Sequence, residues 1–129
     1  MNNFPFLSPA QALVLFRVVV SLLLVAHGVM RISAGTVHDF GDFLDSKGFM
    51  IGVSIAWLLT IFEIMGGLTM AAGYFAKWIA AVFIIEIGMG IILVHAQHGW
   101  FVVGHQLNGI EYSVLLIFSL LLIAATDKR

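Results

Sequence analysis

Three ionisable side chains lie inside long apolar stretches of this sequence, and they are the first residues that could do chemistry. At about 1.5 Å of rise per helical residue, Glu63 and Glu86 fall about 16 Å, and Arg17 about 10 Å, from the same face of a membrane. A charge in hydrocarbon needs a partner or a water-lined cavity. We therefore predict a buried Arg17–Glu63 ion pair, with Glu86 joining it or staying protonated as a candidate proton carrier. The sequence leaves open whether the pair only fixes the register of two helices or takes part directly in transport or chemistry.

A second group of polar side chains lies near the opposite ends of the same stretches. His27, His95 and Glu111 share this level, with Arg31 and Tyr112 close to them in the chain. Imidazole and carboxylate groups exchange protons near neutral pH, so these five residues form a candidate site for a small polar headgroup such as a quinone.

Two other interpretations of this second group stay open. The histidines could be interfacial side chains with hydrated tips. His27, His95 and Glu111 are also the right types for a two-histidine, one-carboxylate metal site. No two of them are spaced i, i+4 on one helix, so no metal is firmly predicted.

The elements that must position these residues are four apolar runs. Each is close to the roughly 20 residues that a bilayer-crossing helix needs. Their approximate bounds are 10–30, 49–74, 75–94 and 107–125. The runs lack the period-two alternation of barrel strands. We predict an all-α membrane protein with one integral membrane domain over residues 1–129, built as a four-transmembrane-helix bundle.

The composition supports this class and excludes others. Apolar residues make up 61% of the 129 residues and charged residues 10%, and the mean hydropathy is +1.08. A soluble domain carries roughly 25% charged residues, so a soluble monomer is excluded. The net charge of −1 excludes a polybasic nucleic-acid binder, and the absence of cysteine excludes disulfides and thiolate metal sites in this chain.

The connection between the first two runs predicts a short amphipathic helix at the membrane surface. Thr36-Val37-His38-Asp39 is typical of a capping box, and Gly48 is a plausible end. Apolar residues recur at helical spacing at Val37, Phe40, Phe43 and Leu44. Between the last two runs, residues 99–104 are too short to span, and we predict an interfacial loop with Trp100 at headgroup level.

The basic residues predict the orientation. Four spans place both termini on one side, together with four of the six Lys and Arg residues: Arg17, Lys77, Lys128 and Arg129. Because cytoplasmic segments carry the excess of Lys and Arg, we expect both termini in the cytoplasm.

Three short motifs, in order and spacing, resemble those of the DoxX/DoxD family of small four-helix bacterial inner-membrane proteins. An Arg early in the first helix precedes them, and the likeness covers roughly residues 12 to 125. The motifs are His27-Gly28-Val29-Met30-Arg31, then Glu63-Ile64-Met65-Gly66-Gly67 followed by Gly73 and Lys77, then Asn108-Gly109-Ile110-Glu111-Tyr112 after His95. The chain departs from the family at its end, because Ala124-Ala125-Thr126-Asp127-Lys128-Arg129 stands where the family often has a Gly-x-Gly segment.

The resemblance implies a multi-pass protein of the bacterial inner membrane linked to redox chemistry. Founding members of the family are subunits of a thiosulfate:quinone oxidoreductase, and relatives associate with thiol and superoxide defence proteins. We expect an accessory or quinone-interacting subunit of a membrane redox system, with quinone as the possible cofactor. Its expected partners are the lipid bilayer, a soluble or membrane oxidoreductase subunit and a second copy of the chain. The alternatives are a small proton-coupled permease and a structural membrane anchor for a soluble oxidoreductase.

Overall fold

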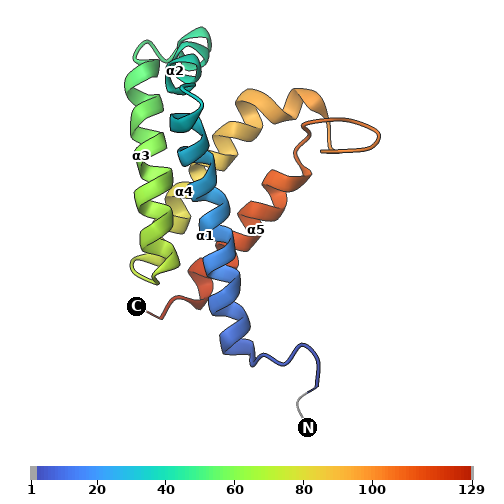
Figure 1. Cartoon of the computed structure of the whole chain (residues 1–129). Helices are drawn as coiled ribbons and strands as arrows, with labels where there is room; N and C mark the ends of the chain where they lie inside the picture. Colours follow the sequence, from blue (N-terminus) through green and yellow to red (C-terminus); the bar gives the residue numbers. More distant parts are fainter. Residues whose placement is uncertain (1–2, 129) are drawn as a thin grey trace. The chain divides into compact units, whose positions relative to one another are not determined.

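The computed structural model describes residues 3–128, and within that range it contains helices and no strands (Figure 1). The prediction of an all-α protein is confirmed. Five α-helices are present, with a π-helical and a 3-10 segment after the fourth. Their bounds are α1 Pro9–Ser33, α2 Val37–Ser46, α3 Gly52–Ala71, α4 Ala76–Gly90, η1 Ile91–His95, η2 Ala96–His98 and α5 Glu111–Thr126.

The chain divides into two compact units, which are described separately below. The first comprises residues 1–74 and contains α1, α2 and α3. The second comprises residues 75–129 and contains α4, η1, η2 and α5. The assignment of the whole chain to one domain stays a prediction.

Helix α1 begins with a capping box that the sequence analysis missed. The Ser8 hydroxyl accepts a hydrogen bond from the backbone N–H of Gln11, and the Gln11 side chain accepts one from the backbone N–H of Ser8. Pro9 at the first helical position has no N–H that needs a partner. The spacing Ser8-Pro9-Ala10-Gln11 is the sequence signal for this start.

Helices α1 and α3 pack closely because glycines face the partner helix. A Cβ atom on Gly28 of α1 would lie 2.9 Å from the backbone oxygen of Thr60 on α3. A Cβ atom on Gly67 of α3 would lie 3.2 Å from the backbone oxygen of Ser21 on α1. Gly28, late in α1, lies beside Thr60, whereas Ser21, earlier in α1, lies beside Gly67, later in α3. The two helices therefore run antiparallel. Such close approach is the usual basis of helix association in lipid.

Glycines on α4 do not have this role. Within residues 3–128, no atom of another residue lies within 4 Å of a Cβ atom built on Gly88 or Gly90. A small residue on a helix does not by itself show which face meets a neighbour.

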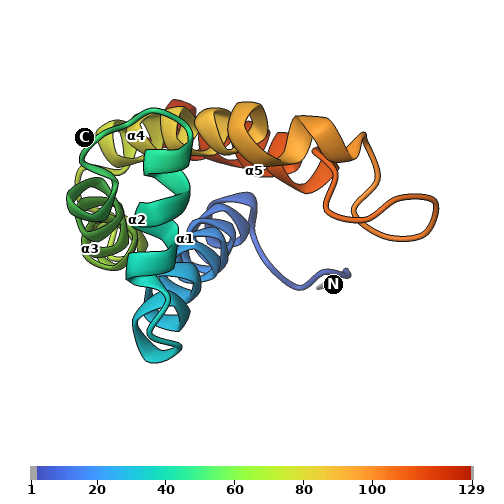
Figure 2. The same cartoon turned by 90° about the horizontal axis from the view of Figure 1, so that it is seen from above.

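Helix α2 is the predicted amphipathic helix, and it packs against the start of α3 (Figure 2). Val37, Gly41 and Leu44 form its buried side, and a Cβ atom on Gly52 would collide with the backbone oxygen of Gly41. The Asp45 carboxylate accepts a hydrogen bond from Gly52 N at 2.7 Å, which satisfies a free N–H at the first residue of α3.

The predicted capping box at the start of α2 is wrong. The Thr36 side chain makes no capping hydrogen bond, and its hydroxyl instead donates to the backbone oxygen of Arg31 at 3.4 Å. Thr36 follows α1 by only a few residues, so the last turn of that helix takes the hydroxyl. The predicted end is confirmed, since α2 finishes at Ser46 and Gly48 adopts a positive φ of 97°.

In the second unit α4 and α5 form a helical hairpin. Asp127, just beyond α5, accepts a hydrogen bond from the backbone N–H of Lys77 at the start of α4, with a length of 2.9 Å. At the other end, residues 99–110 connect the helices. The buried side chains of the hairpin include Ala80 and Phe83 on α4 and Leu116 and Leu120 on α5.

Among the residues that the structure describes, three segments are long and apolar enough to cross a membrane: Pro9–Ser33, Gly52–Ala71 and Ala76–His98. The fourth apolar helix, α5, begins at Glu111 rather than near Leu107 and has 16 residues. The predicted fourth span is therefore too long at its start. Asn108 has a φ of 62°, and its N–H bonds back to the oxygen of Val102, so this segment belongs to the loop. The chain is a membrane protein by its apolar helices.

Candidate functional site: an interhelical ion pair and a histidine-bearing loop

The structure pairs Arg31, in the last turn of α1, with Glu63 in the middle of α3. The guanidinium donates through both terminal nitrogens, with Nη1 2.6 Å from Oε2 and Nη2 3.2 Å from Oε1. The side chains of Arg31 and Glu63 are 18% and 10% exposed. This two-point contact fixes both the distance and the rotation of one helix against the other.

Two further residues complete the surroundings of the Arg31 guanidinium. Nη1 also donates to the hydroxyl of Thr60 at 2.9 Å, and this hydroxyl in turn donates to the backbone oxygen of Ala56 at 2.6 Å. The ring of Phe40 on α2 lies with its centroid 4.5 Å from the guanidinium carbon. All three helices of the first unit thus contact one cation, and we call Arg31, Thr60, Glu63 and Phe40 the arginine cluster.

The predicted Arg17–Glu63 ion pair is wrong, because Glu63 pairs with Arg31. The prediction counted depth from the helix ends and took those ends as level. In the structure, Gly67 near the end of α3 lies beside Ser21 and Val25, so the first turns of α1 extend beyond α3. This stagger places Glu63 beside Gly28, one turn before Arg31. Arg17 is about 21 Å further down the helix axis, where it is half-buried.

Glu86 lies in α4, in the second unit, and is half-buried. The prediction that Glu86 lies at the same depth as Arg17 and Glu63 compares residues of two different units, so it stays a prediction. Its role as a proton carrier stays a prediction.

The second predicted group is represented in the second unit by His95, Glu111 and Tyr112. His95 ends the π-helical segment η1, and its Nδ1 lies 2.9 Å from the backbone oxygen of Asn108 across the loop. A carbonyl oxygen can only accept, so Nδ1 must carry the proton in this contact. The neutral ring then presents Nε2 as a proton acceptor. Single π-helical turns are frequent at functional sites.

Glu111 is the first residue of α5, and its carboxylate serves the loop. Oε1 accepts a hydrogen bond from the backbone N–H of Val102 at 2.9 Å. Tyr112 follows with 39% of its surface exposed. His95, Glu111 and Tyr112 thus lie at the same end of the α4–α5 hairpin.

The other two members of the predicted group belong to the first unit. His27 is exposed on α1, and Arg31 is committed to Glu63 and Thr60. The proposed convergence of all five residues on one ligand stays a prediction. Among residues 3–128, no group of three or more His, Asp or Glu side chains is arranged to hold a metal ion, so the weak metal hypothesis for His27, His95 and Glu111 gains no support.

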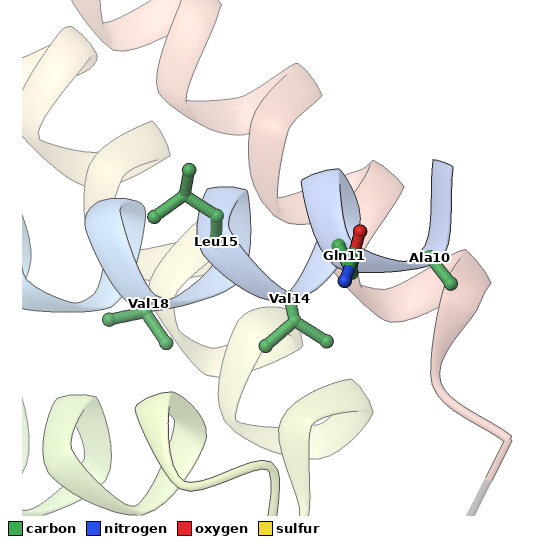
Figure 3. A pocket seen from close by; sticks show the side chains of 5 residues that line it. All are labelled: Ala10, Gln11, Val14, Leu15 and Val18. Atoms are coloured by element: carbon green, nitrogen blue, oxygen red, sulfur yellow. The ribbon is translucent and has the colours of Figure 1, made fainter. Parts of the chain in front are cut away.

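A shallow pocket lies against the first turns of α1, lined by Ala10, Gln11, Val14, Leu15 and Val18 (Figure 3). Its polar side chain is Gln11, which is already used in the capping box with Ser8. The pocket therefore presents an apolar lining without a free polar group to orient a ligand, and it is not a candidate site.

Sequence reasoning missed Thr60, Phe40, Gln106 and Asn108 as parts of these sites. Thr60 stands one turn before Glu63 on the same helix face, so its spacing could have indicated a shared partner. Asn108 contacts His95 through its backbone oxygen, and the Gln106 side chain accepts a hydrogen bond from the backbone N–H of Trp100 across the loop. No local spacing rule predicts such contacts.

Comparison with known proteins supports the family resemblance. Residues 12–96, which are 85 of the 129 residues, match the family model described as DoxX. The matched region includes α1 from its fourth residue onward, all of α2, α3 and α4, and the π-helical segment that ends at His95. Searches of curated proteins and of solved structures returned no match.

The arginine cluster predicts unequal effects of two identical substitutions on α3. Thr60→Val removes a buried hydroxyl that accepts from Arg31, and we expect it to lower the free energy of unfolding by about 1–2 kcal/mol. Thr69→Val is the matched control, because the Thr69 hydroxyl bonds only to the backbone oxygen of Met65 one turn back. Reversible unfolding in detergent micelles measures both. Equal losses for the two variants would show that the contact between Thr60 and Arg31 contributes nothing.

Proposed function

Because this chain belongs to the DoxX family, we propose that it is an accessory, quinone-binding subunit of a redox system in the bacterial inner membrane. The proposed headgroup site lies at the loop end of the α4–α5 hairpin. It consists of His95, Glu111 and Tyr112.

The observation that carries this proposal is the 2.9 Å contact between Nδ1 of His95 and the backbone oxygen of Asn108. The Asn108 oxygen holds the Nδ1 proton, so Nε2 is left to exchange a proton with a ligand. Nε2 accepts from a hydroxyl when the ring is neutral and donates to a carbonyl oxygen when the ring is protonated. Those are the two polar groups of a quinol and a quinone, so the residue fits both forms of the headgroup.

The two neighbouring side chains suit the same ligand. Glu111 adds a carboxyl group that can exchange a proton with the ligand, and its Oε1 accepts a hydrogen bond from the backbone N–H of Val102. Tyr112 offers an exposed aromatic ring that can contact a flat headgroup. A bound quinone would supply two-electron, two-proton chemistry, and this chain would hold the headgroup and exchange protons with it.

The proposal of an accessory role rests on whether side chains of this chain can store electrons. The sequence has no cysteine, so the chain itself holds no thiol pair that could store electrons. We therefore assign electron transfer to a soluble or membrane oxidoreductase partner. Glu86 precedes His95 by about 14 Å of helical rise, toward the start of α4, and it is the candidate proton carrier.

Quinone binding by the purified protein tests the proposal. We expect saturable binding of a water-soluble ubiquinone or menaquinone analogue, weakened about fivefold by His95→Gln, since one hydrogen bond is worth roughly 1 kcal/mol. Glu111→Gln keeps an oxygen for Val102 N while it removes the charge, and it should also weaken binding. His38→Gln is the matched control, because His38 is an exposed histidine on α2.

Two results would contradict the quinone site. One is the absence of saturable binding together with the absence of quinone in lipid extracts of the purified protein. The other is equal affinity for the wild type and the His95→Gln, Glu111→Gln and His38→Gln proteins. Circular dichroism of each variant checks that the helices are retained.

We also propose that all four apolar helices cross the membrane, with both termini in the cytoplasm. Helix α5 is about 24 Å long by its rise, which is shorter than the roughly 30 Å hydrocarbon core. A helix this short is accommodated by local thinning of the bilayer or by the apolar residues that precede it.

Cysteine labelling tests the topology directly, because the natural chain has no cysteine. Asp42→Cys on the exposed side of α2 should react with a membrane-impermeant maleimide added outside intact spheroplasts. Lys128→Cys should react only after the membrane is opened. Labelling of both positions, or of neither, in intact spheroplasts would contradict four crossings with cytoplasmic termini.

A further inference from the structure

Residues 99–110, the loop that joins the two helices of the second unit, combine an apolar surface with an internally bonded backbone. The segment contains no Lys, Arg, Asp or Glu, and its one ionisable side chain is His105. Large apolar side chains are nevertheless exposed on it: Trp100 at 48%, Phe101 at 39%, Val103 at 70% and Leu107 at 71%. Loops in contact with water usually show the opposite composition.

Side chains satisfy the backbone N–H groups of the first half of this loop. The amide oxygen of Gln106 accepts from Trp100 N at 3.0 Å and from Phe101 N at 3.3 Å. The Glu111 carboxylate accepts from Val102 N at 2.9 Å. Three successive N–H groups are therefore bonded within the protein.

Backbone contacts close the second half of the loop onto the first. Asn108 N, Gly109 N and Ile110 N donate to the oxygens of Val102, Phe101 and Gly99. Gly109 permits this approach, because a Cβ atom there would collide with the backbone of Trp100. The oxygen of Asn108 is used as well, by His95.

This bonding pattern distinguishes two parts of the loop. The base, residues 99–102 and 108–110, donates all its N–H groups internally. The tip, residues 103–107, donates no backbone hydrogen bond to the part of the chain that the structure describes. An unbonded N–H in hydrocarbon costs several kcal/mol. The base therefore suits an apolar surrounding, whereas the tip needs polar partners such as headgroups or water.

We propose that loop 99–110 is inserted in the lipid leaflet at this end of α4, with its base among the upper acyl chains and its tip among the headgroups. The occupant of its apolar surface is lipid rather than a protein partner. The loop follows directly on Ala76–His98, a segment apolar and long enough to span the membrane. Trp100 stands two residues past the end of that segment, where aromatic side chains are enriched in membrane proteins. Gln106 has a positioning role as the side chain that ties the tip to the base.

This proposal goes beyond the quinone site and can be tested without a quinone. The chain has three tryptophans, so Trp57→Phe with Trp78→Phe leaves Trp100 as the sole fluorophore. Both replaced side chains are partly exposed on α3 and α4, and Phe retains most of their apolar surface. The double variant is reconstituted in phosphatidylcholine vesicles that carry a nitroxide either high or low on the acyl chain.

Insertion of the loop predicts a defined quenching pattern. Trp100 emission should be blue-shifted, quenched most by the shallow nitroxide, less by the deep nitroxide and little by aqueous iodide. Gln106→Ala on the same background should shift the emission to the red and raise iodide quenching, because it frees two N–H groups that favour water. His105→Ala is the matched control, since no backbone hydrogen bond depends on its side chain.

Two outcomes would overturn the proposal. Strong iodide quenching without nitroxide quenching would place the loop in water. Protection from both quenchers would place Trp100 in a protein contact. In either case, circular dichroism that matches the wild type for the same Trp57→Phe, Trp78→Phe protein would exclude global unfolding as the cause.

Discussion

A charge on an apolar helix needs a partner or a water-lined cavity, and in the first unit Arg31 and Glu63 are each other's partners. Arg31 of α1 is bonded at two points to Glu63 of α3 and at a third to Thr60. Gly28 allows the helix backbones to come close enough for these bonds. The Phe40 ring of α2 lies over the guanidinium and adds a cation–π contact. Hydrophobic burial supplies little force between helices in lipid, so polar contacts and close packing must fix their register.

The same constraint shapes the second unit, where backbone groups rather than charges need partners. Gln106 and Glu111 accept from three N–H groups at the start of the loop. Residues 108–110 donate backbone hydrogen bonds to the carbonyl groups of the same segment. The Asn108 oxygen is satisfied by His95, and this contact leaves Nε2 of the imidazole for other chemistry. A structural requirement of the loop thus also determines the tautomer of the residue on which the proposed quinone site depends. Glu111 accepts a hydrogen bond from the loop and is also part of the proposed quinone site, so it links the loop structure to the proposed function.

The sequence predicted the helices well and their pairing poorly, for a physical reason. Apolar length and periodicity are local properties, so α1, α3, α4 and the amphipathic α2 could be predicted within a few residues. The start of α5 could not, because Asn108 leaves the helical conformation in order to close a loop with residues far from it in the chain. The partner of Glu63 was misassigned because depth was counted from helix ends that the structure shows to be staggered. A register between helices depends on where glycines allow contact, and only the packed structure shows this for Gly28 and Gly67.

The central claim of this account is that Arg31 and Glu63 stabilise the first unit as a pair rather than as two separate polar residues. A double-mutant cycle tests it most directly, with Arg31→Gln, Glu63→Gln and the double variant unfolded reversibly in the same detergent. The account predicts that each single variant loses more stability than half of the double variant's loss, with a coupling energy of about 1–3 kcal/mol. Additive losses, with a coupling energy within about 0.5 kcal/mol of zero, would contradict it.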